Sequence, residues 1–221
     1  MRTKRGIGRE REDMERIGRS IIITVRFVAA MLLVAVLSPV RDAPGTTNSA
    51  FLTMLSALDG ELSLVIWKSR YMVTLYKGQT PLKTYRAVFG RGYPEGDKER
   101  TGDRRTPEGE FYICSMNHST RFYKFLGLSY PSLRHAGQGL RRGIITAGEF
   151  AAIAQALQER RQPSWETRLG GAVGIHGRMI EDPAAHAARQ NWTDGCIALA
   201  NADMDELFSL ASIGMPVSIV P

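Results

Sequence analysis

Two residues near the C-terminus have the types and spacing of a nucleophilic site. His176 follows the apolar run Ala172–Ile175, and Cys196 comes 20 residues after it. A free thiol is mostly protonated at neutral pH, so a nucleophilic cysteine needs a neighbouring base or cation, and an imidazole supplies both. The spacing is too long for one helix face, but two adjacent strands joined by a loop would bring the pair together. The two residues therefore indicate acyl transfer through a cysteine.

Each of these residues also has an ordinary structural interpretation. A free cysteine is among the most often buried residues, and a single histidine is often a satisfied core side chain. The surrounding residues favour chemistry. Gly195 directly precedes the thiol, and a glycine allows a turn in which the backbone N–H groups of Gly195 and Cys196 face a developing oxyanion. We therefore treat Cys196, His176 and Gly195 as candidate catalytic residues.

The wider sequence resembles the YkuD-type L,D-transpeptidases, in which His-Gly precedes a Ser/Thr-x-Gly-Cys motif. Here these motifs are His176-Gly177 and Thr193-Asp194-Gly195-Cys196. Further segments resemble one branch of that family, and together the marks extend over residues 61–221. These segments are Gly96-Asp97-Lys98, Gly102-Asp103, Thr106–Phe111, Ser129-Tyr130-Pro131 and Asn191-Trp192-Thr193.

The resemblance implies a mainly β catalytic domain over residues 61–221, a curled mixed sheet or sandwich with small helical insertions. It also implies a thioester mechanism on peptidoglycan stem peptides. Cys196 would attack the bond before the terminal D-amino acid while His176 moves the proton, and an amine of a second stem would complete a 3→3 cross-link. With water as acceptor the chain would instead trim stems or release wall-attached protein. A third alternative, a silent membrane-tethered wall-binding module, is disfavoured by the intact pair.

Two positions depart from the family pattern. Many relatives have His where this chain has Asp194, and Arg where it has Ala198. An ionised Asp194 would repel a thiolate, so we expect it to turn away and pair with Arg178 or Arg189, or to bind backbone N–H groups in the turn. The indole of Trp192, just before this motif, would either stack on a sugar or stem peptide or serve as a core aromatic. The candidate substrate-binding residues are Gly177, Arg178, Trp192, Thr193 and Asp194.

The N-terminal residues 1–43 have the pattern of a membrane-targeting segment. Residues 1–20 hold seven Arg or Lys and four acidic residues, and a mostly apolar run from Ile21 to Val40 follows. Counted from Ile21 the run suits an uncleaved anchor, and counted from Phe27 it suits a signal peptide. The basic flank stays in the cytoplasm, so the domain is expected on the periplasmic side of the membrane, anchored or released.

The basic charge gives no evidence for nucleic-acid binding. Residues 1–26 contribute +4 of the formal net charge of +7, which leaves about +3 for the exported part. A nucleic-acid-binding arm would not lead straight into an apolar run. The expected partners are peptidoglycan stem peptides and, through the N-terminal segment, the membrane, and we expect a monomer.

Neither a metal nor a cofactor is expected. The four histidines are scattered, and no Cys-x-x-Cys or His-Glu-x-x-His spacing occurs. The second cysteine, Cys114, lies in a strand-like run where a small buried side chain is expected. Because a disulfide with Cys196 would consume the nucleophile, we expect two free thiols.

Hydrophobic patterning places the elements that would carry these residues. After a linker over residues 44–60, which includes a short helix at Phe51–Leu58, short apolar runs predict strands. A helix near residues 147–161 is expected to pack over the sheet, and Asn201 is expected to cap another that ends at Leu210. The predicted strands are Leu62–Trp67, Tyr71–Tyr76, Lys83–Phe89, Glu110–Ser115, Ala172–Ile175, Ile197–Leu199 and Val217–Val220.

A long charged loop, Gly90–Gly109, separates the third and fourth predicted strands. Loops of this length in a compact domain are usually functional or disordered. Its cations would either meet carboxylates of a peptide stem or remain solvated. These cations are Lys98, Arg100, Arg104 and Arg105.

Overall fold

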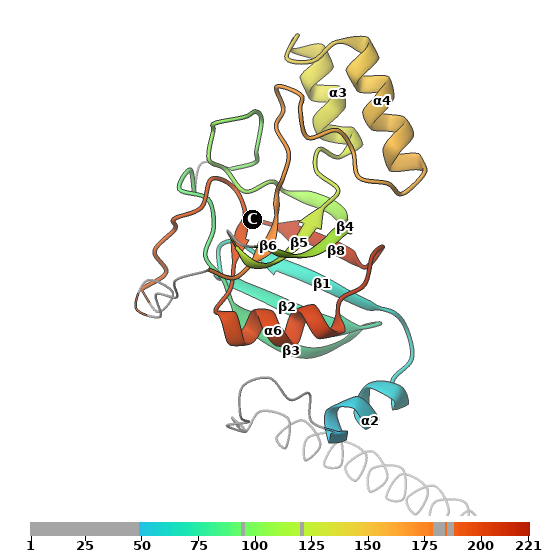
Figure 1. The fold of residues 1–221 in the computed structure, drawn as a ribbon, viewed down its shortest axis with the longest axis vertical. Coiled ribbons are helices and arrows are strands. Elements are labelled where there is room, and N and C mark those ends of the chain that lie inside the picture. Colours follow the sequence, from blue (N-terminus) through green and yellow to red (C-terminus); the bar gives the residue numbers. More distant parts are fainter. Residues whose placement is uncertain (1–48, 94–95, 120–121, 179–183, 185–187) are drawn as a thin grey trace, which may run out of the picture. The chain divides into compact units, whose positions relative to one another are not determined.

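The computed structural model describes residues 49–93, 96–119, 122–178, 184 and 188–221, so the predicted targeting segment lies outside the described residues. Within them, eight strands form one mixed sheet in the order β3-β2-β1-β8-β4-β5-β6-β7 (Figure 1). The strands are β1 (Leu62–Trp67), β2 (Met72–Lys77), β3 (Thr80–Arg86), β4 (Gly109–Ser119), β5 (Tyr123–Leu128), β6 (Gly174–His176), β7 (Ile197–Ala198) and β8 (Pro216–Val220).

The last strand of the chain joins the two halves of the sheet. β8 runs parallel to β1, with Leu64 opposite Val217, and antiparallel to β4, with Phe111 opposite the same valine. Leu64 and Val217 are almost fully buried, as are Ile66 and Ile219 two pairs further along. A fully buried aliphatic side chain contributes roughly 1.5–3 kcal/mol to folding, so this central seam anchors the sheet.

The candidate catalytic residues lie at the edge of the sheet formed by β6 and β7. β5 pairs antiparallel with β6, with Phe125 opposite His176. β6 in turn pairs parallel with β7, with Ile175 opposite Ile197. His176 therefore ends one strand, and Cys196 directly precedes its neighbour.

Four helices accompany the sheet in the described part of the chain: α2 (Ser49–Ala57), α3 (Leu133–Arg141), α4 (Ala147–Gln158) and α6 (Asn201–Leu210). α4 begins with a capping box, in which Thr146 accepts from the Glu149 N–H while the Glu149 carboxylate accepts from the Thr146 N–H. None of these helices has the length and apolar character that a membrane crossing requires.

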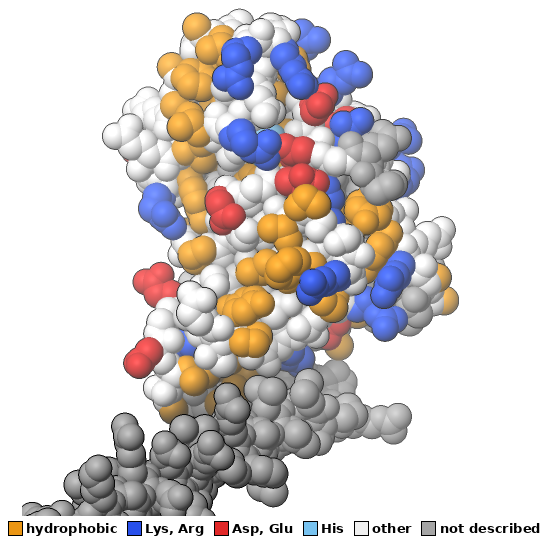
Figure 2. Space-filling model, turned by 180° about the vertical axis from the view of Figure 1, so that it is seen from behind, with side chains coloured by type: hydrophobic (Ala, Val, Ile, Leu, Met, Phe, Trp, Pro, Cys, Tyr) orange, Lys and Arg blue, Asp and Glu red, His pale blue; other side chains and the backbone are white. Residues whose placement is uncertain are grey.

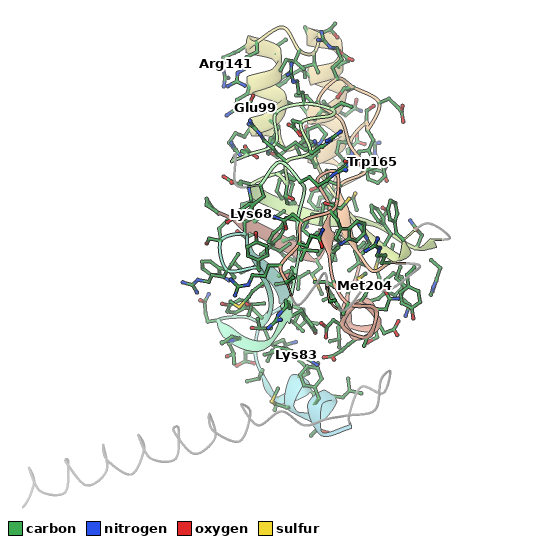
Figure 3. The ribbon with its side chains drawn as sticks, turned by 90° about the vertical axis from the view of Figure 1, so that its left-hand side faces the viewer. Lys68, Lys83, Glu99, Arg141, Trp165 and Met204 are labelled. Carbon is green, nitrogen blue, oxygen red and sulfur yellow. The ribbon has the colours of Figure 1, made fainter. Side chains whose placement is uncertain are left out.

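The α3–α4 hairpin has a small core of its own, which corrects the expectation that the second helix packs over the sheet. Ala136 of α3 and Ile153 of α4 are fully buried together with Ile145 and Leu169, apart from the main core. The apolar stripe of α4 is thus covered by its partner helix, and the hairpin projects beyond the sheet (Figure 1). Lys and Arg side chains are spread over this end of the molecule (Figure 2), and Arg141 marks its tip in Figure 3.

The structure also contains two elements that the pattern did not predict, β5 and α3. The last four residues of β5, Phe125–Leu128, are all buried, so the strand lacks the polar–apolar alternation that signals a half-exposed strand. α3 includes Gly137 and Gly139, each costing about 1 kcal/mol of helix propensity. A Cβ at Gly139 would lie 2.8 Å from Leu169 Cδ2, so packing requires a glycine here. The same glycine lowers the helix propensity of the segment, which is why the pattern did not predict α3.

Candidate active site

His176 is held in a defined orientation by its neighbours. Its side chain is buried, and its Nδ1 lies 2.6 Å from the Gly177 carbonyl oxygen. Because a carbonyl only accepts hydrogen bonds, Nδ1 carries the proton and Nε2 is left as the basic nitrogen. The ring packs against Phe122 at 4.5 Å between centroids and against Trp192 at 5.6 Å in an edge-on geometry. These contacts fix the orientation of the imidazole.

Cys196 directly precedes β7, the strand that pairs with the strand ending at His176. Paired strands are about 4.8 Å apart, so the parallel β6–β7 pairing brings the two segments together as the sequence spacing predicts. The thiol donates to the Ala172 carbonyl oxygen at 3.4 Å. Cys196 and His176 line the same pocket, whose volume is about 1000 Å³.

The other cysteine has an environment unsuited to nucleophilic chemistry. Neither cysteine forms a disulfide bond, and burial raises the pKa of Cys114 to about 11. Cys114 therefore stays protonated at neutral pH. Of the two cysteines, only Cys196 lines the pocket with a histidine.

Thr193 closes the turn that presents the nucleophile. Its hydroxyl donates to the Cys196 carbonyl at 2.7 Å and accepts the Gly195 N–H at 3.2 Å. That second bond corrects the expectation that the Gly195 N–H faces a developing oxyanion, since the group is engaged inside the turn. Gly195 has a φ of +134°, and a Cβ there would lie 2.8 Å from the Arg105 carbonyl oxygen. The glycine at this position therefore allows the turn to pack against Arg105 of the loop Gly90–Gly109.

The segment after β3 holds this turn on both sides. Val88 exchanges two backbone hydrogen bonds with Ala198, at 3.0 and 2.9 Å, just beyond the cysteine. Before the cysteine, the Arg91 N–H donates to the Thr193 carbonyl at 3.0 Å. The Phe89 N–H donates to the Asn191 side chain at 2.8 Å. The nucleophile turn is therefore anchored by residues about a hundred positions earlier in the chain.

The charged loop Gly90–Gly109 combines exposed residues with a buried ion pair that packs against the turn. Lys98 is only 4% exposed; its ammonium binds Asp103 at 2.7 Å and the Arg100 carbonyl at 3.1 Å. Asp103 also accepts the backbone N–H groups of Glu99, Arg100 and Arg105 at 2.7–3.0 Å. The Lys98 ammonium lies 3.7 Å from where a Gly195 Cβ would be. Lys98 is thus neither solvated nor unpaired.

A second buried lysine ties the same loop to the sheet. Lys68, just after β1 and 2% exposed, donates to the Glu108 carboxylate at 2.7 Å and to the carbonyls of Gly96 and Thr106. In Figure 3 its side chain lies inside the body of the molecule. Sequence reasoning missed this residue, because nothing in the run Trp67-Lys68-Ser69 distinguishes it from a solvated turn lysine.

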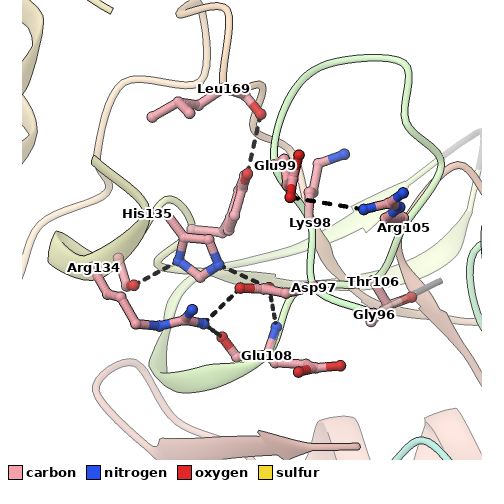
Figure 4. A network of polar contacts seen from close by, with 12 residues as sticks. Gly96, Asp97, Lys98, Glu99, Arg105, Thr106, Glu108, Arg134, His135 and Leu169 are labelled. Carbon is pink, nitrogen blue, oxygen red and sulfur yellow. Dashed lines mark hydrogen bonds and ion pairs between the residues drawn. The ribbon is translucent and has the colours of Figure 1, made fainter. Parts of the chain in front are cut away.

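Asp97 is the centre of the polar network drawn in Figure 4. It binds His135 Nε2 at 3.0 Å and Arg134 at 2.7 Å, and accepts the Glu108 N–H at 2.7 Å. Burial acts to raise the pKa of Asp97, but the hydrogen bonds and charge of these partners outweigh it and bring the pKa to about 2. The only sequence signal for this network was the family-like Gly-Asp-Lys and Thr-Pro-Glu-Gly motifs.

Asp194 forms ion pairs, but with other arginines than those predicted. It pairs with Arg91 at 2.5 Å and with Arg104 at 3.8 Å. Arg178 stacks over Trp192 at 4.7 Å, and Arg189 stacks over Tyr71 at 5.3 Å. The predicted pairing of Asp194 with either of these last two is therefore wrong. The Asp194 side chain is 70% exposed, so its ion pairs are well solvated and contribute little stability.

Asn201 braces the segment that follows the histidine. Its side-chain oxygen accepts the Arg178 N–H at 2.8 Å, and its amide nitrogen donates to the Arg178 carbonyl at 2.9 Å. A Cβ at Gly177 would lie 2.4 Å from the same oxygen, which explains the glycine. The N-cap of α6 is Ala200, without a side-chain cap, so the prediction that Asn201 caps the helix is wrong.

The pocket brings together most of the predicted site. Gly177 is outside the lining, while the other predicted residues belong to it: Cys196, His176, Gly195, Arg178, Trp192, Thr193 and Asp194. Sequence reasoning missed the aromatic side chains of Phe122 and Trp165, which also line it. Within the described ranges, no group of three or more His, Cys, Asp or Glu residues is arranged to hold a metal ion.

Comparison with known proteins gives one family match. The model of the YkuD L,D-transpeptidase catalytic domain matches residues 62–219. No curated protein matches the chain.

Several solved structures resemble the chain at low identity. A mutant of the helical cell shape determining protein Pgp2 from Campylobacter jejuni is 17% identical over 76% of this chain and 52% of that one, with a TM-score of 0.48. Bd1075 from Bdellovibrio bacteriovorus is 13% identical over 75% and 49%, with a TM-score of 0.47. An L,D-transpeptidase from Xylanimonas cellulosilytica is 14% identical over 73% and 61%, with a TM-score of 0.45. The chain thus spans about half to three fifths of these proteins.

Proposed function

Since the chain belongs to the YkuD family of L,D-transpeptidase catalytic domains, we propose that it is a cysteine acyltransferase acting on peptidoglycan stem peptides. One observation carries the proposal. The histidine whose Nδ1 is hydrogen-bonded to the Gly177 carbonyl ends β6, the cysteine directly precedes the paired strand β7, and both residues line one pocket. That is the base–nucleophile arrangement which thioester chemistry needs.

The proposed reaction has two steps. His176 Nε2 takes the proton of the Cys196 thiol, and the sulfur attacks the carbonyl carbon of the bond before the terminal D-amino acid. The C–N bond breaks, the leaving amine takes the proton from His176, and a thioester remains. An amine of a second stem then attacks the thioester carbonyl, forms the 3→3 amide and regenerates the thiol. Trp192 and Phe122 hold the imidazole ring throughout.

Hydrolysis of the thioester is the alternative on the same site, and it would make the chain a carboxypeptidase or endopeptidase. One experiment tests both functions. The purified protein is incubated with disaccharide tetrapeptide, and the products are identified by mass spectrometry. A cross-linked dimer supports transfer, and a lone tripeptide supports hydrolysis. No product, together with no carbapenem adduct on Cys196, would contradict the proposal as a whole.

The proposed place of action is the periplasmic side of the cytoplasmic membrane. Basic residues before Ile21 and the apolar run to Val40 support export of the domain that follows. Peptidoglycan lies in the same compartment, so the proposed substrate and the proposed location agree. We propose a monomer whose partners are stem peptides and, through the N-terminal segment, the membrane.

A further inference from the structure

Four cations line the pocket around the nucleophile: Arg91, Lys98, Arg104 and Arg178. The first three have carboxylate partners, because Arg91 and Arg104 meet Asp194, and Lys98 meets Asp103. The Arg178 guanidinium has no acidic partner among the residues that the structure describes. Among the pocket cations, the one that no described carboxylate neutralises is best able to bind an anion of the substrate.

Arg178 is also held in place. Its guanidinium lies 4.7 Å above the Trp192 ring, a stacking that suits the planar, weakly hydrated arginine head group. Its backbone is bonded at both N and O to the side chain of Asn201. An anchored guanidinium loses little conformational entropy on binding, and its fork of donors matches a carboxylate in a bidentate geometry.

The proposed base, His176, and the Arg178 guanidinium both contact the indole of Trp192. Trp192 contacts the His176 ring on one side and the Arg178 guanidinium on its face. In the proposed reaction His176 protonates the leaving nitrogen. When the leaving group is a C-terminal amino acid, that nitrogen and the α-carboxylate are attached to the same carbon. The group that protonates the amine and the group that binds the carboxylate must then be adjacent.

We propose that Arg178 binds the α-carboxylate of the departing C-terminal residue, so that the site selects peptides whose scissile bond is their last. This proposal rests on the proposed function and specifies its acyl donor. A peptide amide, or a stem extended beyond the scissile residue, lacks a carboxylate at that position. Such donors lose the charged hydrogen bonds and leave the guanidinium with no anion.

The test compares one muropeptide with two C-termini. Full-length protein is given disaccharide tetrapeptide with a free terminal carboxylate, or the same molecule with a terminal primary amide, and kcat/KM is measured by mass spectrometry. We expect the acid to be preferred about tenfold to a hundredfold, the range for a charge-assisted hydrogen bond. In Arg178→Gln this preference disappears because turnover of the acid falls while turnover of the amide is unchanged. Arg178→Lys should restore part of it.

Arg70 supplies a matched control, because its guanidinium also stacks on an indole, that of Trp67, at 4.7 Å, and it does not line the pocket. Arg70→Gln should leave both rates unchanged. Equal turnover of acid and amide by the wild-type protein would overturn the role of Arg178 while leaving the proposed function intact. An equal loss on both substrates in Arg178→Gln would also overturn it, since that pattern indicates a structural role. If the wild type turns over neither peptide, the proposed function and this inference fail together.

Discussion

Replacing Lys98 by Met tests whether the loop under the nucleophile is held by a buried ion pair. Lys98 is 4% exposed and Asp103 is 9% exposed, so the substitution leaves a buried carboxylate without its cation. Breaking a buried pair in this way costs about 3–5 kcal/mol. Three backbone N–H groups still bind Asp103, at 2.7, 2.9 and 3.0 Å, and they place the expected loss at the lower end, about 3 kcal/mol.

Urea unfolding followed by tryptophan fluorescence measures this loss. With a slope of about 2 kcal/mol per molar for a domain of this size, the midpoint of Lys98→Met should fall by about 1.5 M. Arg100→Met, an exposed cation of the same loop, should stay within about 0.5 kcal/mol of the wild type. The double variant Lys98→Met/Asp103→Asn should lose less than the sum of the single losses, because it removes the unpaired charge. A midpoint for Lys98→Met that equals the Arg100→Met midpoint would refute the buried-pair argument.

Three further predictions concern the thiol, the acid stability and the export of the chain. A carbapenem should add its mass to the wild type and to Cys114→Ala but not to Cys196→Ala; equal loss in both variants would contradict the assignment of Cys196. The folded pKa of Asp97, about 2, lies below its ordinary value of 3.8, so its contribution is complete above about pH 4 and is lost as the pH falls toward 2. This amounts to about 2 kcal/mol, and urea unfolding at pH 5 and pH 2.5 should therefore show a smaller acid loss in Asp97→Asn than in the wild type. An export-dependent reporter fused after Pro221 should be active and should become inactive when residues 1–40 are deleted; an active reporter in the deleted form would contradict the targeting argument.

Local patterning predicted the strands because their burial follows from nearby residues. Leu62–Trp67 is a strand with the predicted bounds, and Pro216–Val220 and α4 lie within one to three residues of theirs. Local patterning could not predict that β8 pairs between β1 and β4. Strands about 150 residues apart in the sequence share no periodic signal that would indicate their pairing. β5 and α3 were missed for a local reason, as one is buried on both faces and the other is weakened by packing glycines.

The candidate catalytic pair could be named from the sequence, whereas the residues that support it could not. Cys196 and His176 could be proposed as a pair because few residue types perform acyl transfer, and the structure places both residues in one pocket. The partners of the charged residues were not identifiable, because a lysine on a loop has the same sequence signature whether it is solvated or buried. Lys98, Lys68 and Asp194 each have partners that only the folded chain specifies.

The buried loop also gives a physical reason for the glycine before the nucleophile. A Cβ at Gly195 would lie only 2.8 Å from the Arg105 carbonyl oxygen and 3.7 Å from the Lys98 ammonium, so the loop packs closely against the turn. Displacing the loop would therefore disturb the backbone that carries Cys196 as well as the ion pair. Since Thr193 is bonded to the segment Phe89–Arg91 on the opposite flank, the turn is held from two directions. In the proposed reaction, a cysteine fixed in this way meets a buried, oriented imidazole with little loss of conformational entropy.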